Sequence, residues 1–364
     1  MALKMDEQAR DSGRVRNEVL RAKEQTYFYP RGKGELRFND NTSPYGPPPA
    51  VRELMGRSVA EVIGGVEEST FYPDQNADAL RSAVAAVEGI EPDCIVTGTG
   101  ADELLDILFR VFVDKGEIVT IPVPAYFMYE HLASLNSATI RTPHMGRPPK
   151  LPDGADSKSK MYIFSNPHNP TGSLFPREDI VRLVDSFKGM VVVDEAYVEY
   201  ADSTVVPLIR NHPNLVVVRT FSKIYGLPNF RIGYCIASVE IALQLRKVKN
   251  PFNLTTVSQK LATAAVQDRG YVASIRSTNG LERRRISTAL ESLGFHVFSS
   301  SANFILIDLG DRCNSIFSAL VGKGVYTKTV NDAGYENCIR VTVRSKEEND
   351  EMLSRLSDIM LDLP

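Results

Sequence analysis

The most informative stretch of this chain reads Met190-Val191-Val192-Val193-Asp194-Glu195-Ala196-Tyr197. It begins with a strand-sized, valine-rich apolar run and passes at once into two carboxylates and a tyrosine. Similar short runs occur at 94–97, 118–121, 160–164, 215–219 and 232–237, separated by longer amphipathic or polar stretches. Strands that alternate with helix-length connections predict an α/β fold with a largely parallel sheet.

The length of the chain, 364 residues, suits a large domain and a smaller one. The alternating pattern places the large domain at 46–250. Beyond it, residues 255–293 have the pattern of one long helical stretch, and alternating segments at 303–308 and 339–343 precede a final helix. We therefore expect a smaller α+β domain at 251–364, which includes the linking helix.

The N-terminal arm, residues 1–45, is expected to belong to the smaller domain and to pack across the active site or a partner subunit. Its first 25 residues mix basic and acidic side chains around a thin apolar stripe, which indicates a charged helix. A secretory signal needs an uninterrupted apolar stretch, and transit peptides are poor in acidic residues. We therefore expect a cytoplasmic protein.

Composition and charge argue against several classes of function. A net charge of -3 provides no field that would attract nucleic acid or an anionic membrane. The apolar runs are far shorter than the roughly 18 to 20 residues that span a bilayer. The cysteines and histidines show neither the spacing of metal ligands nor a redox motif. We expect small-molecule partners, no nucleic acid, no membrane and no metal.

Candidate functional residues follow the predicted strands, at the edge where open α/β sheets bind their ligands. Lys223 lies just after the run 215–219, where a lysine can form a Schiff base. Its neighbours Ser222 and Arg231 could hold a phosphate group. Taken alone, a serine–lysine pair is more often a solvated surface feature.

A second group of candidates could hold a pyridine ring. A carboxylate such as Asp194 keeps a pyridine nitrogen protonated, which makes the ring an electron sink. Tyr197 and Asn169, the latter in a rigid loop at 166–172, could together hold one oxygen of that ring. The structural alternatives are an acid that caps a turn and a loop built of turn residues.

A glycine-rich turn at Gly100 and Ala101 leads into a predicted helix that opens at Asp102. Helix N-termini offer free N–H groups and a favourable dipole to anions, although an ordinary capped helix fits this pattern equally well. Tyr126 follows another strand and could stack on a planar cofactor. An aromatic residue at such a position is also common in a core.

In their order and spacing, these segments resemble the fold-type-I aminotransferases of classes I and II, most closely the histidinol-phosphate aminotransferase branch. The resemblance covers nearly the whole chain. The matching segments are Asn41-Thr42-Ser43-Pro44-Tyr45-Gly46-Pro47, Tyr72-Pro73-Asp74, Gly100-Ala101-Asp102-Glu103, residues 166–172, Asp194-Glu195-Ala196-Tyr197, Ser222-Lys223, Arg231-Ile232-Gly233, Pro251-Phe252-Asn253 and Arg340-Val341-Thr342. The resemblance implies a mostly parallel, seven-stranded sheet between helices in the large domain.

The resemblance also implies pyridoxal 5'-phosphate (PLP) as the cofactor. Lys223 would bind it covalently and move the substrate proton, and Asp194 would pair with its ring nitrogen. The other cofactor-binding residues that the family pattern implies are Gly100, Ala101, Asp102, Tyr126, Asn169, Tyr197, Ser222 and Arg231, with Tyr72 reaching in from the second subunit of a homodimer. The implied substrate-binding residues are Arg340, Lys328, Asn41 and Tyr29.

The chain departs from the family pattern on the substrate side. Thr42 and Ser43 replace the Glu-Asn of the usual Asn-Glu-Asn-Pro, and Lys328 stands where an arginine is common, although lysine cannot reproduce a two-pronged grip. We expect amino-group transfer from an amino acid or amino-phosphate donor to a keto acid or phosphorylated ketone. The alternatives are a PLP-dependent decarboxylase similar to the threonine-phosphate decarboxylases and a specialised secondary-metabolic enzyme. A non-enzymatic PLP-binding regulator is disfavoured because the arm is too short for a DNA-binding head.

Overall fold

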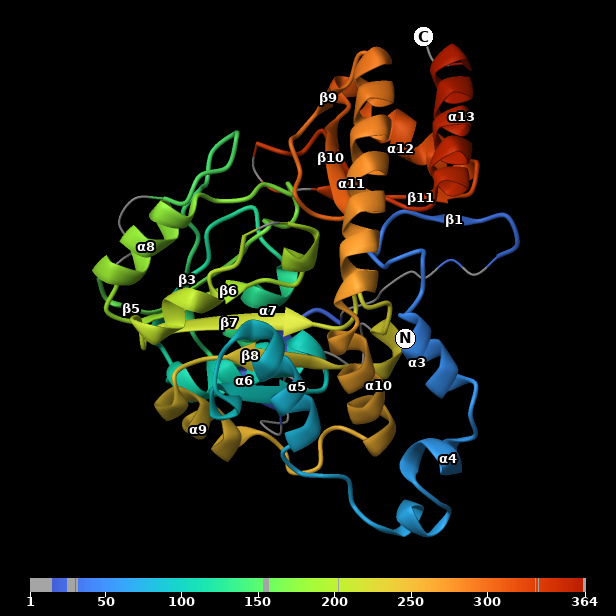
Figure 1. The fold of residues 1–364 in the computed structure, drawn as a ribbon. Helices are drawn as coiled ribbons and strands as arrows, with labels where there is room; N and C mark the ends of the chain where they lie inside the picture. The colour runs from blue at the N-terminus through green and yellow to red at the C-terminus, as the bar shows by residue number, and fades with distance from the viewer. Residues whose placement is uncertain are drawn as a thin grey trace.

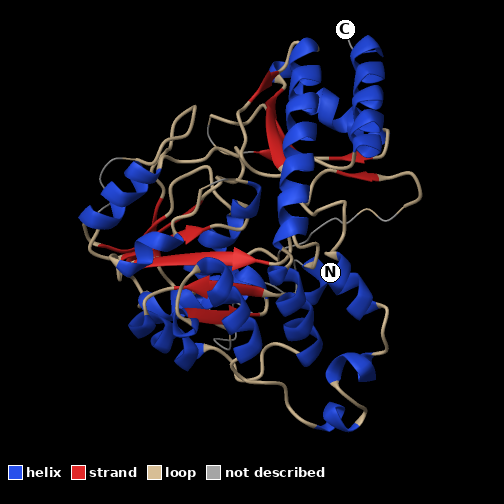
Figure 2. Ribbon diagram, in the orientation of Figure 1, coloured by secondary structure: helices blue, strands red, loops and turns tan. Residues whose placement is uncertain are grey.

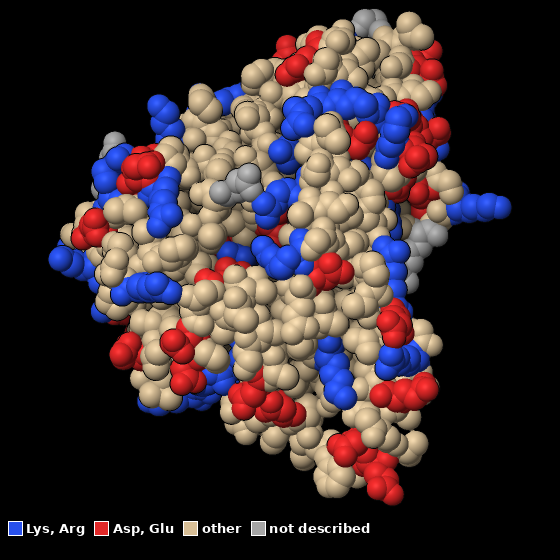
Figure 3. Space-filling model, in the orientation of Figure 1, with Lys and Arg blue, Asp and Glu red and all other residues tan. Residues whose placement is uncertain are grey.

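The computed structural model describes residues 15–24, 30, 32–152, 157–201, 203–330, 332 and 334–362. A larger lobe is built around a central sheet, and a smaller lobe stands on one side of it (Figures 1 and 2). On the face drawn in Figure 3, basic and acidic side chains are interspersed. Among the described residues, no helix has both the length and the apolar character needed to span a bilayer.

The central sheet has seven strands in the order β2-β8-β7-β6-β5-β3-β4. Their bounds are β2 Ile95–Gly98, β3 Ile118–Thr120, β4 Thr139–Arg141, β5 Ser159–Ser165, β6 Met190–Asp194, β7 Leu215–Thr220 and β8 Gly233–Ile236. Neighbouring strands are parallel except at β8, which is antiparallel to both β2 and β7. The predicted α/β fold and its mostly parallel seven-stranded sheet are confirmed. Only β4, a short and largely exposed edge strand, had not been predicted.

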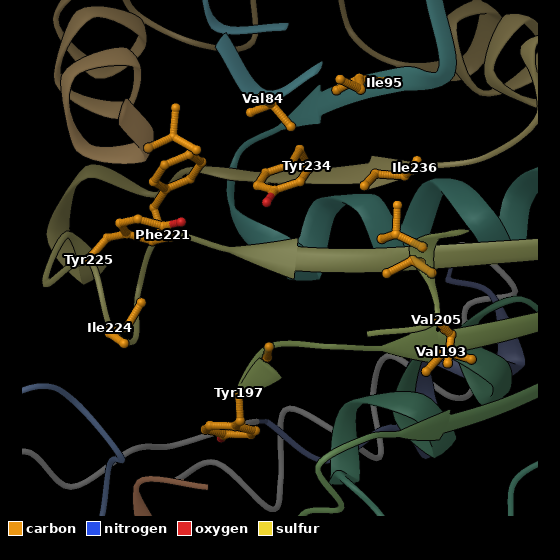
Figure 4. Packing of buried hydrophobic residues seen from close by; sticks show 14 of the residues in the cluster. Val84, Ile95, Val193, Tyr197, Val205, Phe221, Ile224, Tyr225, Tyr234 and Ile236 are labelled. Carbon is orange, nitrogen blue, oxygen red and sulfur yellow. The ribbon is translucent and has the colours of Figure 1, made fainter. Parts of the chain in front are cut away.

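Helices cover both faces of this sheet. On one face lie α6 (Gly100–Phe112), α7 (Phe127–Leu135) and α9 (Val239–Val248), and on the other lie α5 (Asp78–Glu88), α8 (Arg177–Ser186) and α10 (Thr256–Gln267). Val192 of β6 packs against the first group, whereas Val191 and Val193 pack against the second, which Figure 4 shows in part. A strand covered on both faces is apolar at consecutive positions, which explains the valine run.

The smaller lobe contains a four-stranded antiparallel sheet in the order β12-β13-β10-β9. Its strands are β9 His296–Val297, β10 Phe304–Asp308, β12 Lys328–Val330 and β13 Cys338–Thr342. Strands β9, β10 and β13 share a core with α12 (Cys313–Gly322), α13 (Lys346–Asp362) and part of α11 (Arg269–Ser292). A segment of the arm joins this lobe, because β1 (Leu36–Arg37) pairs in parallel with β11 (Val325–Tyr326).

The stretch 255–293, expected to be one long helical stretch, forms the two helices α10 and α11. Asp268 separates them, with a non-helical ψ of 73° and a side chain that accepts the backbone N–H of Tyr271. A side chain that caps the next helix in this way favours a break at that position. Helix α11 then runs from the larger lobe into the smaller one (Figure 1).

The remaining helices are short. They are α2 Asn17–Arg21, α3 Pro49–Met55 and α4 Val59–Ile63, with 3₁₀ turns at Glu67–Thr70, Pro92–Cys94, Val198–Tyr200, Val206–Arg210, Pro228–Phe230 and Gly310–Arg312. The part of the predicted arm helix that the structure describes, residues 15–24, contains α2. It lies against α7, where Arg16 Nη2 donates to the carbonyl of Leu135 at 2.7 Å.

Candidate active site

A cavity of about 260 Å³ lies where the carboxyl ends of β5, β6 and β7 meet the first turn of α6. Residues from eight separate stretches of the chain line it. Those among them that the sequence had singled out are Asn41, Ala101, Asp102, Tyr126, Asn169, Asp194, Tyr197, Ser222, Lys223, Arg231 and Arg340. The tertiary structure therefore brings most of the predicted site residues to one place, at the sheet edge where they were expected.

One end of the cavity is suited to an anion. The backbone of α6 begins there at Gly100, Ala101 and Asp102, and the guanidinium of Arg231 lies beside this helix start. Arg231 donates to the hydroxyl of Ser222 at 3.4 Å and to Asp102 Oδ2 at 3.1 Å. Free N–H groups at a helix start and a fixed guanidinium are a common setting for a phosphate group.

Close packing at this end of the cavity explains why residue 100 is a glycine. Gly100 has a φ of 79°, and a Cβ there would collide with the guanidinium of Arg231. Arg231 itself has a φ of 49°, a left-handed conformation that costs a residue with a side chain roughly 1 kcal/mol or more. This strained backbone conformation occurs at the residue whose guanidinium lies beside the start of α6.

Lys223 is one of the residues that line the cavity. Lys223 follows β7, and its Nζ donates to the carbonyl of Asp40 at 3.0 Å. The ammonium group lies 5.5 Å from the centre of the Tyr197 ring. The side chain is only partly buried and faces the cavity, so it can reach a carbonyl group bound there.

A buried carboxylate stands at the end of β6. Asp194 Oδ1 accepts the backbone N–H of Ala196 at 3.0 Å, and Oδ2 accepts the hydroxyl of Tyr129 at 2.6 Å. Burial raises the pKa of Asp194 to about 6, although these two hydrogen bonds lower it. Tyr126 lies at the same cavity, with its hydroxyl 3.4 Å from Asp102 Oδ1. An aromatic face and a buried carboxylate can together hold a planar ring with a basic nitrogen.

Two residues from opposite lobes meet on the far side of the cavity. Arg340, on β13 of the smaller lobe, donates through Nη1 to Asn169 Oδ1 at 2.6 Å and through Nη2 to the carbonyl of Asn39 at 2.9 Å. Among the described residues its buried Nε has no hydrogen-bond partner. Asn41 Nδ2 donates to the hydroxyl of Tyr197 at 3.1 Å. The guanidinium therefore keeps a donor for a further acidic group.

Three described residues that the sequence predicted for the site, Gly100, Lys328 and Tyr72, are not among those that line this cavity. Lys328 lies in a wider outer cleft of about 990 Å³, which shares Tyr126, Asn169 and Arg340 with the cavity. Tyr72 is 80% exposed and stacks on Phe252, with ring centres 4.6 Å apart. Tyr29 lies outside the described residues.

Sequence reasoning missed the residue that contacts Asp194 from behind, Tyr129. The only local signal was its spacing of three from Tyr126, which places both rings on one side of the start of α7. It also missed Ser165 and Thr220, which line the cavity from the ends of β5 and β7. Within the described residues, no group of three or more His, Cys, Asp and Glu side chains could hold a metal ion.

A family model for class I and II aminotransferases matches residues 33–356. The chain belongs to this aminotransferase family. Histidinol-phosphate aminotransferase from Geobacillus sp. (strain WCH70) is 31% identical to it over 335 residues, which make up 89% of this chain and 90% of that protein. Histidinol-phosphate aminotransferase 2 from Archaeoglobus fulgidus is 32% identical over 330 residues, 90% of this chain and 94% of that protein.

Solved structures place this aminotransferase in the same group. The crystal structure of histidinol-phosphate aminotransferase from Sinorhizobium meliloti in complex with PLP has a TM-score of 0.81 and 25% identity. The match covers 90% of this chain and 92% of that one. The fold-type-I architecture and the PLP-dependent transaminase class expected from the motifs are thereby confirmed.

Proposed function

We propose that the cavity at the strand ends binds PLP and that the enzyme uses it to transfer amino groups from a phosphorylated or acidic amino donor. The observation that carries this proposal is the convergence of Lys223, Asp194 and Arg231 on one cavity of about 260 Å³. Each has the chemistry that a different part of PLP requires, namely its aldehyde, its ring nitrogen and its phosphate.

The groups around the cavity fit the cofactor. Ala101, Asp102, Ser222 and Arg231 would hold the phosphate, and the cradle at Gly100 leaves no room for a side chain. Asp194 would pair with the ring nitrogen, Asn169 and Tyr197 would hold the phenolic oxygen, and Tyr126 would stack on the ring. The Nε of Arg340, which has no hydrogen-bond partner among the described residues, supports a role for Arg340 in binding a substrate carboxylate or phosphate.

The reaction then depends on where these side chains hold protons and charge. When bound, PLP supplies an electron sink and a carbonyl carbon that can carry the amino group. Lys223 would move a proton between the substrate α-carbon and the carbon that carries the cofactor's aldehyde. Asp194 would keep the ring nitrogen protonated, while Arg340 holds the substrate acid and so fixes which bond at the α-carbon is broken.

The outer cleft supports an anionic donor. Lys328 and Arg340 both line it, and burial together with the charge of Arg340 lowers the pKa of the Lys328 ammonium. Two neighbouring cations favour a dianionic group such as a phosphate. Because relatives that cover nearly the whole chain are histidinol-phosphate aminotransferases, we propose an amino-phosphate of that kind as the donor, with Asn41 and Tyr29 contributing to its binding.

We further propose a homodimer in which Tyr72 reaches the phosphate end of the partner's cavity. Tyr72 and its neighbour Phe71 are 80% and 69% exposed, and an exposed aromatic pair of this size is typical of an interface. The four cysteines are free, as expected for the reducing cytoplasm in which we place the enzyme.

Replacing the lysine tests the cofactor assignment. Purified Lys223→Ala is expected to lose the visible absorbance of lysine-linked PLP, while Lys160→Ala, a surface variant on β5, keeps it. Retention of a borohydride-reducible link between protein and PLP in Lys223→Ala would show that another residue holds the cofactor.

A donor panel tests the reaction. The loaded enzyme is incubated with glutamate, histidinol phosphate and threonine phosphate, and both pyridoxamine absorbance and carbon dioxide are measured. Transfer predicts conversion to the pyridoxamine form without carbon dioxide. Release of carbon dioxide without that conversion would instead support the decarboxylase alternative, which the fold allows, since L-threonine-O-3-phosphate decarboxylase from Porphyromonas gingivalis has a TM-score of 0.78 at 20% identity.

A further inference from the structure

Tyr129, on the first turn of α7, stands directly behind the cavity. Its side chain is fully buried, and its hydroxyl donates to Asp194 Oδ2 at 2.6 Å. Its ring also packs edge to face with the Tyr126 ring, with centres 5.6 Å apart and planes at 87°. Tyr129 therefore supports both the carboxylate and the aromatic ring that are proposed to hold the cofactor's ring.

A short hydrogen-bond chain continues from Tyr129 to the opposite side of the cavity. The hydroxyl of Ser165, at the end of β5, hydrogen-bonds with the Tyr129 hydroxyl and accepts the backbone N–H of Asn169 at 2.8 Å. Asn169 and Asp194 would lie at the two polar atoms of the bound ring. Ser165 and Tyr129 thus join the groups at both atoms through the protein rather than through the ligand.

The groups that face Asp194 show why one hydrogen bond matters there. Burial raises the pKa of Asp194, and the charge of Asp102 on α6 acts in the same direction. The opposing influences are the hydrogen bonds from Tyr129 and from the Ala196 N–H, and the more distant charge of Lys223. Within the part of the chain that the structure describes, the ionised carboxylate is therefore held by few groups, and Tyr129 is the one whose side chain donates to it.

Tyr129 is suited to this task over the whole physiological range. Burial and the adjacent Asp194 raise the pKa of its phenol well above the usual value. The hydroxyl consequently stays protonated and always has a proton to donate. A fixed donor beside a buried acid favours the charged form of that acid.

We propose that Tyr129 is a positioning residue that keeps Asp194 ionised and aimed at the ring nitrogen, and that Ser165 ties this arrangement to the loop carrying Asn169. The inference rests on the proposed function, because the ionisation of Asp194 matters for the reaction only if a pyridine ring binds there. It adds Tyr129, which is not among the residues that line the cavity, to the groups that decide whether the ring nitrogen is protonated.

Binding of pyridoxamine 5'-phosphate to the apoenzyme tests the proposal without relying on activity. This compound has no aldehyde and forms no bond with Lys223, so its dissociation constant reports the non-covalent site. Calorimetry from about pH 5 to pH 9 should show that the affinity of the wild type falls below the pKa of Asp194. In Tyr129→Phe the midpoint of this fall should move up by about one pH unit, as expected when a carboxylate loses one hydrogen bond.

Three further variants give the result its meaning. Tyr162→Phe is the matched control, since Tyr162 is also fully buried and, among the described residues, its hydroxyl has no partner; its profile should equal that of the wild type. Asp194→Asn has no carboxylate to protonate at this position, so it should lack the loss of affinity at low pH that protonation of Asp194 causes in the wild type. Ser165→Ala should show a smaller shift in the same direction, and it carries the test if Tyr129→Phe does not fold.

The outcomes separate this inference from the proposed function. A wild type that fails to bind pyridoxamine 5'-phosphate at any pH contradicts the proposed function. If the wild type binds and Tyr129→Phe weakens binding by the same factor at every pH, the role of Tyr129 is merely structural and the inference is wrong. An unchanged fall in Asp194→Asn would also overturn it, because the titrating group would then be another one.

Discussion

Changing Glu199 to Gln is expected to make the protein more stable above neutral pH and to leave its stability in acid nearly unchanged. Glu199 belongs to a buried cluster around Arg219, whose guanidinium lies 2.8 Å from Glu195, 3.2 Å from Glu88 and 3.4 Å from Glu199. Three carboxylates thus share one cation. Among the described residues, Glu199 Oε2 has no hydrogen-bond partner, so this acid is the least well satisfied of the three.

The magnitude follows from the pKa of Glu199. Burial raises it from 4.5 to about 7, against the opposing charge of Arg219. Between these values the folded protein keeps a proton that the unfolded chain has lost, so the free energy of unfolding decreases as the pH rises from about 4.5 to about 7. At about 1.4 kcal/mol per unit, this decrease amounts to roughly 3 kcal/mol. A glutamine, which is neutral at every pH, would not show it.

Urea unfolding of the apoprotein at a series of pH values measures this difference. Protein concentration is kept fixed, because dimerisation and ligand binding both change apparent stability. The free energy of unfolding of Glu199→Gln should exceed that of the wild type by up to about 3 kcal/mol near pH 8. Near pH 5 the two values should match. The control Glu53→Gln removes an exposed carboxylate paired with Arg57 and should show no such pH-dependent gain. A constant difference between Glu199→Gln and wild type at all pH values would refute the reasoning.

Three other substitutions test the site and its support. Gly226→Ala should lower stability by about 1 to 3 kcal/mol and reduce PLP uptake, because Gly226 has a φ of 64° and its Cβ would collide with the carbonyl of Gly46 beside the Lys223 loop; urea unfolding and PLP absorbance equal to those of the wild type would contradict this. Arg340→Lys should raise the KM for the acidic donor roughly tenfold with a smaller change in kcat, since a lysine loses the two-pronged grip; steady-state kinetics in which only kcat falls would argue against substrate binding. Phe304→Ala should cost about 3 to 5 kcal/mol in urea unfolding, because this fully buried ring fills the space beside Tyr197, and a loss below about 1 kcal/mol would show that the lobe interface can collapse around the gap.

Most strands of the larger lobe could be predicted from the amino-acid sequence. The run at β6 is apolar at consecutive positions because helices cover both faces of that strand, and a pattern of this kind depends only on neighbouring residues. The break at Asp268 was missed, since a helical pattern continues on both sides of it and the sign of the break is a side chain that caps the start of α11. Local patterns therefore locate elements better than they locate the ends of elements.

Some residues of the candidate site could likewise be predicted from local sequence patterns, and others could not. Lys223, Asp194 and Asn169 could be named because each follows a recognisable strand, and the carboxyl ends of parallel strands meet at one edge. The order of these motifs, rather than any single one, carried the resemblance to the aminotransferases.

Contacts between distant segments could not be found in this way. Arg340 reaches Asn169 across 171 positions of sequence, and Tyr129 reaches Asp194 across 65. Such contacts depend on strand order, on the placement of α7 and on the packing of the smaller lobe against the larger. The sequence alone determines which chemical groups are present and in what order. Their pairing depends on the fold, which brings separate elements together. The burial that raises the pKa of Asp194 also arises only then, because folding excludes water from between these elements.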